Sequence, residues 1–456
     1  MNINNAEKLI NYGLSKGASF VELFFEDSKY KIINYLDSRV EKVSTSIEHG
    51  VGVRLVYNDV TYYGSTSNID YDNVALVIDE LSLSFTSNGF KEVKLAESTV
   101  YDKSGSHDVF NNSDKKVFLN ELDSAARLYD SRVNQVNVIL KEVVNDVIIA
   151  SSLGHYTKDK RLYSRVYATV YLKENDKLVN NNYNIAFGTG YEKFDKELFK
   201  SKFIECIDEA ILKLNPISIK AGYMPVIIGN GFGGVIIHEA CGHAMEATSV
   251  AKGISVLSDK LNKRIASDKV SIIDDSTIED GWGSLCYDDE GLPTSKRLLV
   301  KDGILVNYLI DYINGLRMGM ESNGCSRRES YKYNPTSRMS NTYLVPGTDK
   351  IEDMISSIDY GLYAKGFSGG VVQPATGQFN FTVTEGYLIE DGKVKGLVSN
   401  VSLIGTCSDI LEKIDMVSDD LEYGYGMCGS ESGSIPVTAS QPTIRVSSIL
   451  VGGDNE

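Results

Sequence analysis

The sequence predicts an α+β protein of two domains, on three observations. Up to about residue 214, segments with helical periodicity alternate with segments rich in β-branched and aromatic residues. The stretch "NPISIKAGYMP" then breaks this pattern with two prolines and a glycine. Downstream, glycine is frequent and the expected strands are short. We therefore expect an N-terminal domain of helices packed on antiparallel strands, residues 1–220, and a mostly-β domain with curved or barrel-like sheets, residues 221–456.

Within the first domain, apolar residues at helical spacing predict four helices. The first presents Ala6, Leu9, Ile10 and Leu14 on one face and ends near Gly17. The other three are expected at residues 73–85, 115–130 and 194–214. Short polar turns separate the expected strands, which occupy residues 20–27, 31–37, 49–59 and, with breaks, 135–186.

In the second domain two stretches predict hairpins, because Asp-Gly between apolar strands favours a two-residue connection. They are "LLVKDGILVNYLID" and "TVTEGYLIEDGKVKGLVSNVSLIG". Earlier, Val226 to Ile228 are expected to form a short buried strand, which a glycine-containing turn follows. The next helix carries "HEACGHAMEATSVAKG" and is expected to stop at Gly253, in the C′ position. Strand, turn and helix deliver this segment towards the core.

Composition excludes several classes of function. The formal net charge is −16 and no run of Lys or Arg is present, so we expect no nucleic-acid partner. No run of about 18 apolar residues occurs, which argues against a membrane span. The start of the chain lacks the basic and apolar regions of a signal peptide. The six cysteines are scattered without C-x-x-C spacing, as reduced thiols are, and we expect a cytoplasmic protein.

The segment "HEACGH" has the form of the zinc-binding H-E-x-x-H signature with one residue added. His238 and His243 are five residues apart, which on a regular helix places them about 140° apart. Five residues is the period of a π-turn, a distortion frequent at functional sites, and Gly242 would ease it. Glu239 follows the first histidine, where a zinc hydrolase keeps its general base. We therefore predict a helix that departs from α geometry and brings both imidazoles to one metal ion.

Two histidines do not complete a catalytic zinc site, which has about three protein ligands and a water. Cys241 is the nearest candidate, but three ligands from a single turn would be crowded. A thiolate distant in sequence is favoured, and the spacing alone does not say which cysteine supplies it.

Two other polar segments have structural interpretations. One is "CSRRESYKYNPTSRMSNTY", in which Arg327, Arg328 and Arg338 could bind substrate carboxylates, although salt bridges to the abundant acids are favoured. The other surrounds the only tryptophan, Trp282, which we expect in the core or in a pocket lining. Its acids lack EF-hand spacing and are expected in solvated turns: Asp274, Asp275, Glu279, Asp280, Asp288, Asp289 and Glu290.

Five stretches occur in the order found in one protein family: "HEACGHAMEA", "ASDKVSIIDDSTIEDGWGSLCYDDEGLPT", "NGCSRRESYKYNPTSRMSNTYLVPG", "SGGVVQPATGQFNFTVTEGYLIEDGKV" and "CGSESGSIPVTASQPTIRVSSILVGG". On these motifs, and over essentially the whole chain, the sequence resembles the TldD/PmbA (TldD/TldE) metallopeptidases, specifically the metal-bearing TldD type. The resemblance implies that His238 and His243 bind Zn²⁺ together with Cys428, which lies in "MCGSESG". It also implies that Glu239 is the catalytic residue.

The same resemblance implies a function and partners. It implies a zinc-dependent peptidase that hydrolyses unfolded or flexible peptides inside a dimer-enclosed cavity, with Glu239 as general base to a metal-activated water. The dimer is expected to be a homodimer, or a heterodimer with a metal-less paralogue of the TldE/PmbA type. The family pattern C-G-K-x-G-Q is altered here, with Ser430 and Ser434 where Lys and Gln are usual, so the family's substrate preference does not transfer directly.

Two alternative functions stay open at this point. One is an amide hydrolase dedicated to a single peptide-like metabolite. The other is a non-catalytic assembly partner of a paralogous subunit, against which the intact "HEACGH" and Cys428 argue, since such a partner has no need of them.

Overall fold

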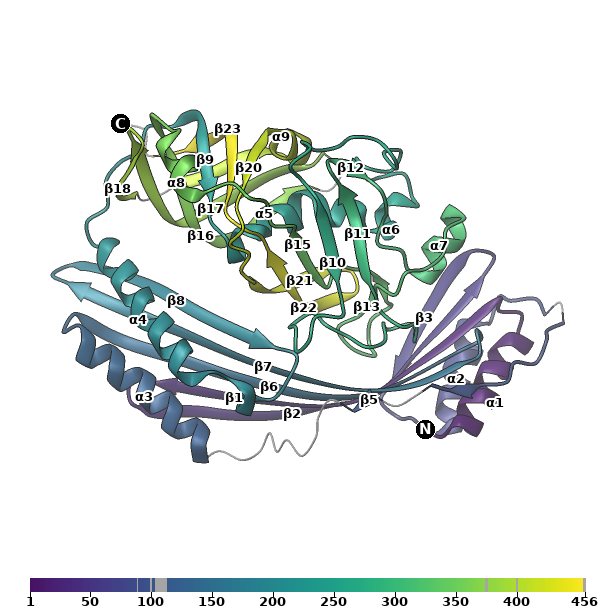
Figure 1. Cartoon of the computed structure of the whole chain (residues 1–456). Coiled ribbons are helices and arrows are strands. Elements are labelled where there is room, and N and C mark those ends of the chain that lie inside the picture. The colour runs from purple at the N-terminus through teal and green to yellow at the C-terminus, as the bar shows by residue number, and fades with distance from the viewer. Residues whose placement is uncertain (88, 99–100, 103–112, 374–375, 399–400, 454–456) are drawn as a thin grey trace.

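The first half of the chain builds a long sheet that curves like half a barrel (Figure 1). The computed structural model describes residues 1–87, 89–98, 101–102, 113–373, 376–398 and 401–453. Within these residues the sheet has eight strands. In spatial order they are β3 (Val60–Thr66), β2 (Arg39–Tyr57), β1 (Phe20–Leu36), β6 (Val133–Ser151) and β7 (His155–Glu174), and β7 also pairs with β8 (Lys177–Phe187), β4 (Ala96–Glu97) and β5 (Tyr101–Asp102).

Helices cover one face of this sheet at its two ends, and the other face is turned towards the second half of the chain (Figure 1). Along β1, Val21 and Leu23 pack with the first two helices, whereas Ile33 packs with the last two. Phe24, which points the opposite way, contacts Tyr331 of the second half, as the period-2 alternation of a strand requires. The helices are α1 (Ile3–Ser15), α2 (Tyr71–Leu81), α3 (Ser113–Tyr129) and α4 (Lys196–Leu212), with a 3₁₀ turn η1 (Tyr191–Lys193) before α4.

The four helices expected from periodicity are confirmed, but the turn expected near residue 28 is wrong. Residues 20–27 and 31–36 lie on one continuous strand, because Ser28 to Tyr30 pair with β2 on one side and with β6 on the other. The polar side chain that suggested a turn is satisfied within the strand, since the Ser28 hydroxyl donates to the Glu26 carboxylate at 2.5 Å.

Five strands of the second half close into a small barrel, which confirms the barrel-like sheet expected there. Closure follows because β16 pairs with β9 on one side and with β17 on the other. In order around the barrel the strands are β16 (Tyr360–Gln373), β9 (Gly222–Ile228), β23 (Ile444–Gly452), β19 (Val401–Thr406) and β17 (Gln378–Glu390); β18 (Lys393–Val398) pairs with β17 and β20 (Ile414–Val417) with β23.

A second sheet of the C-terminal half lies beside the barrel (Figure 1). Both hairpins predicted at Asp-Gly pairs form, with positive φ at Asp302 (48°) and at Asp391 (52°). The sheet runs in the order β12 (Ile304–Leu305), β11 (Lys296–Lys301), β10 (Ile272–Asp275), β15 (Asn341–Leu344), β22 (Gly433–Ser440) and β21 (Tyr425–Ser430), and a separate ribbon joins β13 (Ser326–Arg327) to β14 (Thr336–Ser337).

Short helices connect these sheets, and the central one lies in the core. Ile236, Ile237, Ala240 and Cys241 are at most 1% exposed within the largest apolar cluster. None of the helices in the described ranges has the length and apolar character needed to cross a bilayer. They are α5 (Val235–Ile237), α6 (Ala247–Val250), α7 (Tyr312–Met318), α8 (Ile351–Ser356) and α9 (Cys407–Lys413), with single turns η2 (Gly231–Gly234), η3 (His238–Gly242) and η4 (His243–Met245). The division into domains at residue 220 stays a prediction.

Buried ion pairs join the curved sheet to the C-terminal half. Glu22 on β1 accepts hydrogen bonds from Arg328 and from Arg54 on β2. Arg54 also reaches Glu290 at 2.7 Å. All four side chains are at most 2% exposed. Since an uncompensated charge in such a place costs several kcal/mol, these contacts specify how the two halves fit together.

These contacts correct the expectation that the acidic segment near Trp282 lies in solvated turns. Only part of it does, because Glu279 is exposed. Most of the others find basic partners, as Asp289 binds Arg161 of β7 at 2.7 Å and Asp274 binds Arg297 at 2.6 Å, whereas Asp288 accepts from backbone amides. Within this segment, the acidic residues that are at most 1% exposed are Asp274, Asp288, Asp289 and Glu290.

We expect Arg328→Met to lower the free energy of unfolding by about 3 kcal/mol or more, because Glu22 loses one of its two buried cations. Lys332→Met is the matched control. Its ammonium lies 2.6 Å from Glu48 across the same two halves, but the pair is 50% and 36% exposed, so the loss should stay below about 1 kcal/mol. Chemical denaturation of both variants checks this, and equal losses would contradict it.

Candidate metal centre

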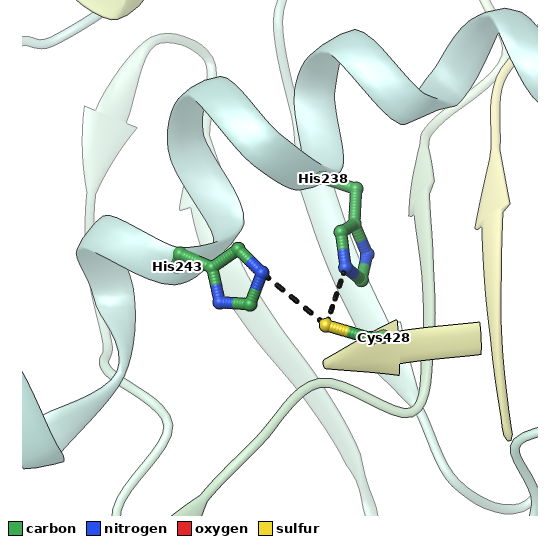
Figure 2. A group of neighbouring side chains, drawn as sticks. All are labelled: His238, His243 and Cys428. Atoms are coloured by element: carbon green, nitrogen blue, oxygen red, sulfur yellow. Dashed lines mark hydrogen bonds between the residues drawn. The ribbon is translucent and has the colours of Figure 1, made fainter. Parts of the chain in front are cut away.

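The segment that carries both histidines is a π-turn. In η3 the amide of His243 donates to the carbonyl of His238, five residues earlier. A regular helix would separate the two side chains by about 140°, and the wider turn removes that separation. Figure 2 shows both rings directed towards Cys428. The predicted departure from α geometry between the two histidines is therefore confirmed.

The helix around this turn is shorter than expected. Glu246 is extended, with φ −73° and ψ 124°, and separates η4 from α6. No continuous helix therefore runs to Gly253, although Gly253 follows α6 with a φ of 68°. The interruption has a local reason, because it lets the Glu246 carboxylate turn back to His243, with Oε2 3.1 Å from Nδ1.

Gly242 is required for steric reasons. A Cβ at this position would lie 2.0 Å from Sδ of Met339, whose side chain is only 1% exposed. Met339 follows β14 and packs against the inside of the π-turn. The glycine thus allows the turn and the neighbouring chain to approach closely, which is a packing requirement rather than a conformational one.

Cys428 reaches the histidines from the far end of the sequence. It lies on β21, the edge strand of the second sheet, opposite Ile435 on β22. Its Sγ is 3.3 Å from Nε2 of His238 and 3.2 Å from Nε2 of His243 (Figure 2). The three donor atoms lie within 4.8 Å of one another, and in the described part of the chain no other His, Cys, Asp and Glu side chains form such a group.

The electrostatics of this group favour the deprotonated thiol. Burial raises the pKa of Cys428, but the charges of and hydrogen bonds from His238 and His243 outweigh it and lower the pKa to about 3. Burial lowers the pKa of His243, yet the neighbouring Glu246 and Cys428 raise it well above its ordinary value. Cys428 is therefore a thiolate at neutral pH, the form in which cysteine binds metals.

Glu246 and Arg338 support this group, and neither role follows from the sequence pattern. Glu246 fixes the ring of His243 through Nδ1, so that Nε2 faces the sulfur. Arg338 is fully buried, and its Nε lies 3.9 Å from Oε1 of Glu246. It also donates to the carbonyl of Cys428 at 2.6 Å and to the hydroxyl of Ser432 at 2.7 Å. One guanidinium thereby connects the helical and the strand parts of the site.

Glu239 lies beside the donor atoms without joining them. Its Oε2 is 3.7 Å from Nε2 of His243, and its side chain is 25% exposed, more than that of either histidine. A carboxylate at this distance can accept a proton from a water held at the site, and its exposure leaves access for a substrate.

Comparison with known families gives matches along most of the chain. The model described as "PmbA/TldA metallopeptidase C-terminal domain" matches residues 221–453, "domain 1" matches residues 21–84 and the "central domain" matches residues 108–214. The chain belongs to the PmbA/TldD family. The family resemblance of the sequence is thus confirmed.

Curated relatives of this PmbA/TldD protein carry consistent names. The Metalloprotease TldD homolog of Buchnera aphidicola (subspecies Acyrthosiphon pisum) is 33% identical, covering 95% of this chain and 92% of its own. That of Haemophilus influenzae is 33% identical, with 96% and 94% covered. The Zinc metalloprotease TldD homolog of Saccharolobus solfataricus is 26% identical, with 98% and 99% covered.

Solved structures share the fold at lower identity. TldE from Thermococcus kodakarensis superposes with a TM-score of 0.76 at 19% identity, covering 98% of this chain and 100% of the other. A putative modulator of a DNA gyrase from Thermotoga maritima gives 0.77 at 19% identity, covering 98% and 99%. At this identity the likeness establishes the fold of this PmbA/TldD protein and nothing finer.

The other candidate residues lie outside the metal group. Cys241 is fully buried beside Cys407, away from the imidazoles, which agrees with the preference for a distant cysteine. Ser430 is exposed at the end of β21, and the amide of Ser434 donates to Glu329 at 2.7 Å. Of the three arginines singled out in the sequence, Arg328 and Arg338 lie within ion-pair distance of carboxylates, whereas Arg327 shows no such pair in the described residues.

We expect Gly242→Ala to destabilise the protein by about 1–3 kcal/mol, because the added methyl group overlaps the Met339 sulfur. Met339→Ala in the same chain should restore part of the loss, although alone it leaves a cavity. Unfolding free energies of the two single variants and the double variant form the test. If the double variant loses the sum of the two single losses in unfolding free energy, the contact between residue 242 and Met339 is not the cause of the destabilisation.

Proposed function

We propose that the protein is a zinc-dependent peptidase that hydrolyses peptide bonds of unfolded or flexible peptides. The observation that carries the proposal is the convergence of two imidazoles and a thiolate with a carboxylate, Glu239, beside them. The family match and the names of the curated relatives support a metallopeptidase, and one of those names specifies zinc. Histidine and cysteine donors are the ones that zinc prefers in proteins.

The spacing of the proposed ligands, His238, His243 and Cys428, fits an ion of this size. Tetrahedral zinc with bonds of about 2.1 Å to nitrogen and 2.3 Å to sulfur holds these atoms about 3.6 Å apart. The two sulfur–nitrogen separations here are 3.3 and 3.2 Å, a few tenths of an ångström below that value, and all three donor atoms lie within 4.8 Å of one another. When bound, zinc would lower the pKa of a water and polarise the scissile carbonyl.

Glu239 would act as general base and then as general acid. Its carboxylate accepts the proton of the attacking water and delivers it to the leaving amine. Glu246 and Arg338 would act as positioning residues, because they orient the His243 ring and hold the Cys428 backbone. A peptide has to approach from the side of Glu239, whose side chain is the most exposed of the four.

We also propose that the chain works as a dimer, with a second copy or with a metal-less paralogue of the TldE/PmbA type, enclosing the active site. An open edge of the curved sheet supports this, since the part of β2 before Val51 has no strand on its outer side among the described residues. Val43 and Ile47 on this edge are 52% and 68% exposed. An open edge carrying apolar residues is a surface that another chain can pair with.

Native mass spectrometry of the chain expressed alone, and co-expressed with a metal-less relative, tests this pairing. We expect a dimeric mass in at least one of the two preparations, because pairing would cover the β2 edge. A monomeric mass in both would contradict the dimer and leave the peptidase proposal standing.

Two variants test the chemistry. Glu239→Gln should retain zinc and lower the hydrolysis rate by about 10²–10⁴-fold, because the general base is removed. Cys428→Ala should lose stoichiometric zinc, because one of three ligands is gone. Elemental analysis and hydrolysis of an unfolded protein such as casein are measured on the same preparations, with Cys286→Ala as the control.

Undiminished zinc in Cys428→Ala would overturn the ligand assignment, and full activity in Glu239→Gln would overturn the role of the carboxylate. Hydrolysis confined to one small amide, with casein untouched, would favour a dedicated amide hydrolase instead.

A further inference from the structure

A cavity of about 200 Å³ lies between the curved sheet and the hairpin that carries Cys428. β6 and β7 form one wall, with Lys141 and Tyr163 among the lining residues, and Met427 and Pro436 of the hairpin form the opposite wall. Met427 directly precedes Cys428 along β21, so its side chain faces the cavity from the side of the strand opposite to the proposed metal ligand. Its volume accommodates several waters or one side-chain-sized group.

Arg327 lines this cavity and has no ion-pair partner among the described residues. Only 3% of the residue is exposed, yet its one hydrogen bond in the described structure goes to the carbonyl of Met339 at 2.8 Å. No carboxylate among the described residues lies within ion-pair distance of it. Burial accordingly lowers the pKa of Arg327 to about 10. A buried guanidinium has five N–H donors, and an anion is their natural acceptor.

The neighbouring arginines show what Arg327 lacks. Arg328, next in sequence, binds Glu22, and Arg161 binds both Asp159 and Asp289. These cations are satisfied by the fold itself. Arg327 is equally buried but has no carboxylate partner. We therefore regard Arg161 and Arg328 as structural cations and Arg327 as a cation available to a ligand.

The charge of the whole lining favours an anion. Lys141 is a second cation without an ion pair in the described residues, and burial lowers its pKa. The lining carboxylates are engaged, since Asp289 binds Arg161 and Glu329 accepts the Ser434 amide at 2.7 Å. In a protein of net charge −16, a cavity with two unpaired cations is an exception to the general surface.

We propose that this cavity binds a carboxylate of the peptide substrate through Arg327, with Lys141 at its side. The inference rests on the proposed peptidase function and adds a substrate preference to it. The carboxylate can be the C-terminal group of a peptide or an acidic side chain, because both present the same pair of oxygens to a guanidinium.

Trp282 provides a readout that needs no turnover. It is the only tryptophan of the chain and lines the cavity, so its fluorescence responds to a ligand there. The probe is acetyl-trialanine with a free carboxylate, titrated into full-length Glu239→Gln protein so that it is not consumed. We expect saturable binding of the acid and at least about tenfold weaker binding of its C-terminal amide.

Arg327→Gln in the same background should raise the dissociation constant of the acid to that of the amide and leave the amide unchanged. If this variant does not fold, Lys141→Gln, which removes a cation of the lining that has no ion pair in the described residues, should still weaken binding of the acid alone by several-fold. Lys301→Gln, an exposed cation on β11 outside the cavity, is the control for net charge and should have no effect.

An amidated peptide with one internal glutamate distinguishes the two sources of the carboxylate. If it binds like the acid, the cavity accepts side chains; if it binds like the amide, the cavity reads the C-terminus. Equal binding of all three peptides, or an unchanged preference in Arg327→Gln and Lys141→Gln, would overturn the inference. Hydrolysis without a preference for carboxylate-bearing peptides would contradict only the carboxylate site, whereas absence of zinc-dependent hydrolysis would contradict the proposed function.

Discussion

The hydrogen bond from the His243 amide to the His238 carbonyl is the constraint on which the site depends. It adds one residue to a helical turn, and only this addition brings two side chains five residues apart onto the same side. Local propensity does not favour such a turn. The surrounding core stabilises it, because Ala240 and Cys241 are buried in the largest apolar cluster and Gly242 admits Met339 against the backbone. The geometry of the donors is thus a product of packing.

The buried guanidinium of Arg338 connects the π-turn to the rest of the C-terminal half. Arg338 has no solvent contact and holds the carbonyl of Cys428 together with the loop at Ser432, while Glu246 approaches it from the other side. Burying an arginine is costly unless its donors are used. Here the guanidinium donors bind the backbone next to the Cys428 thiolate, and these hydrogen bonds offset the cost of burying the charge. They also hold the helical and strand segments in an orientation that neither would keep alone.

The sequence predicted what depends on local spacing and missed what depends on distant contacts. The interval between His238 and His243 implied the π-turn, and Asp-Gly pairs implied the hairpins. Cys428, 185 residues beyond His243, came only from the family resemblance, since no periodicity relates the two. The acids near Trp282 were misassigned to solvent because their partners are distant in sequence. Arg161 on β7, for instance, is 128 residues from its partner Asp289. Glu246 and Arg338 escaped notice for the same reason.

The ion pairs between the curved sheet and the C-terminal half also limit how the molecule can move. A hinge that opened the two halves would separate Glu22 from Arg328 and Arg54 from Glu290, and each separation would leave charges without partners in a partly closed gap. These ion pairs therefore oppose a hinge motion between the two halves. For the proposed peptidase, a substrate would have to reach Glu239 without such an opening, which favours extended peptides over folded domains.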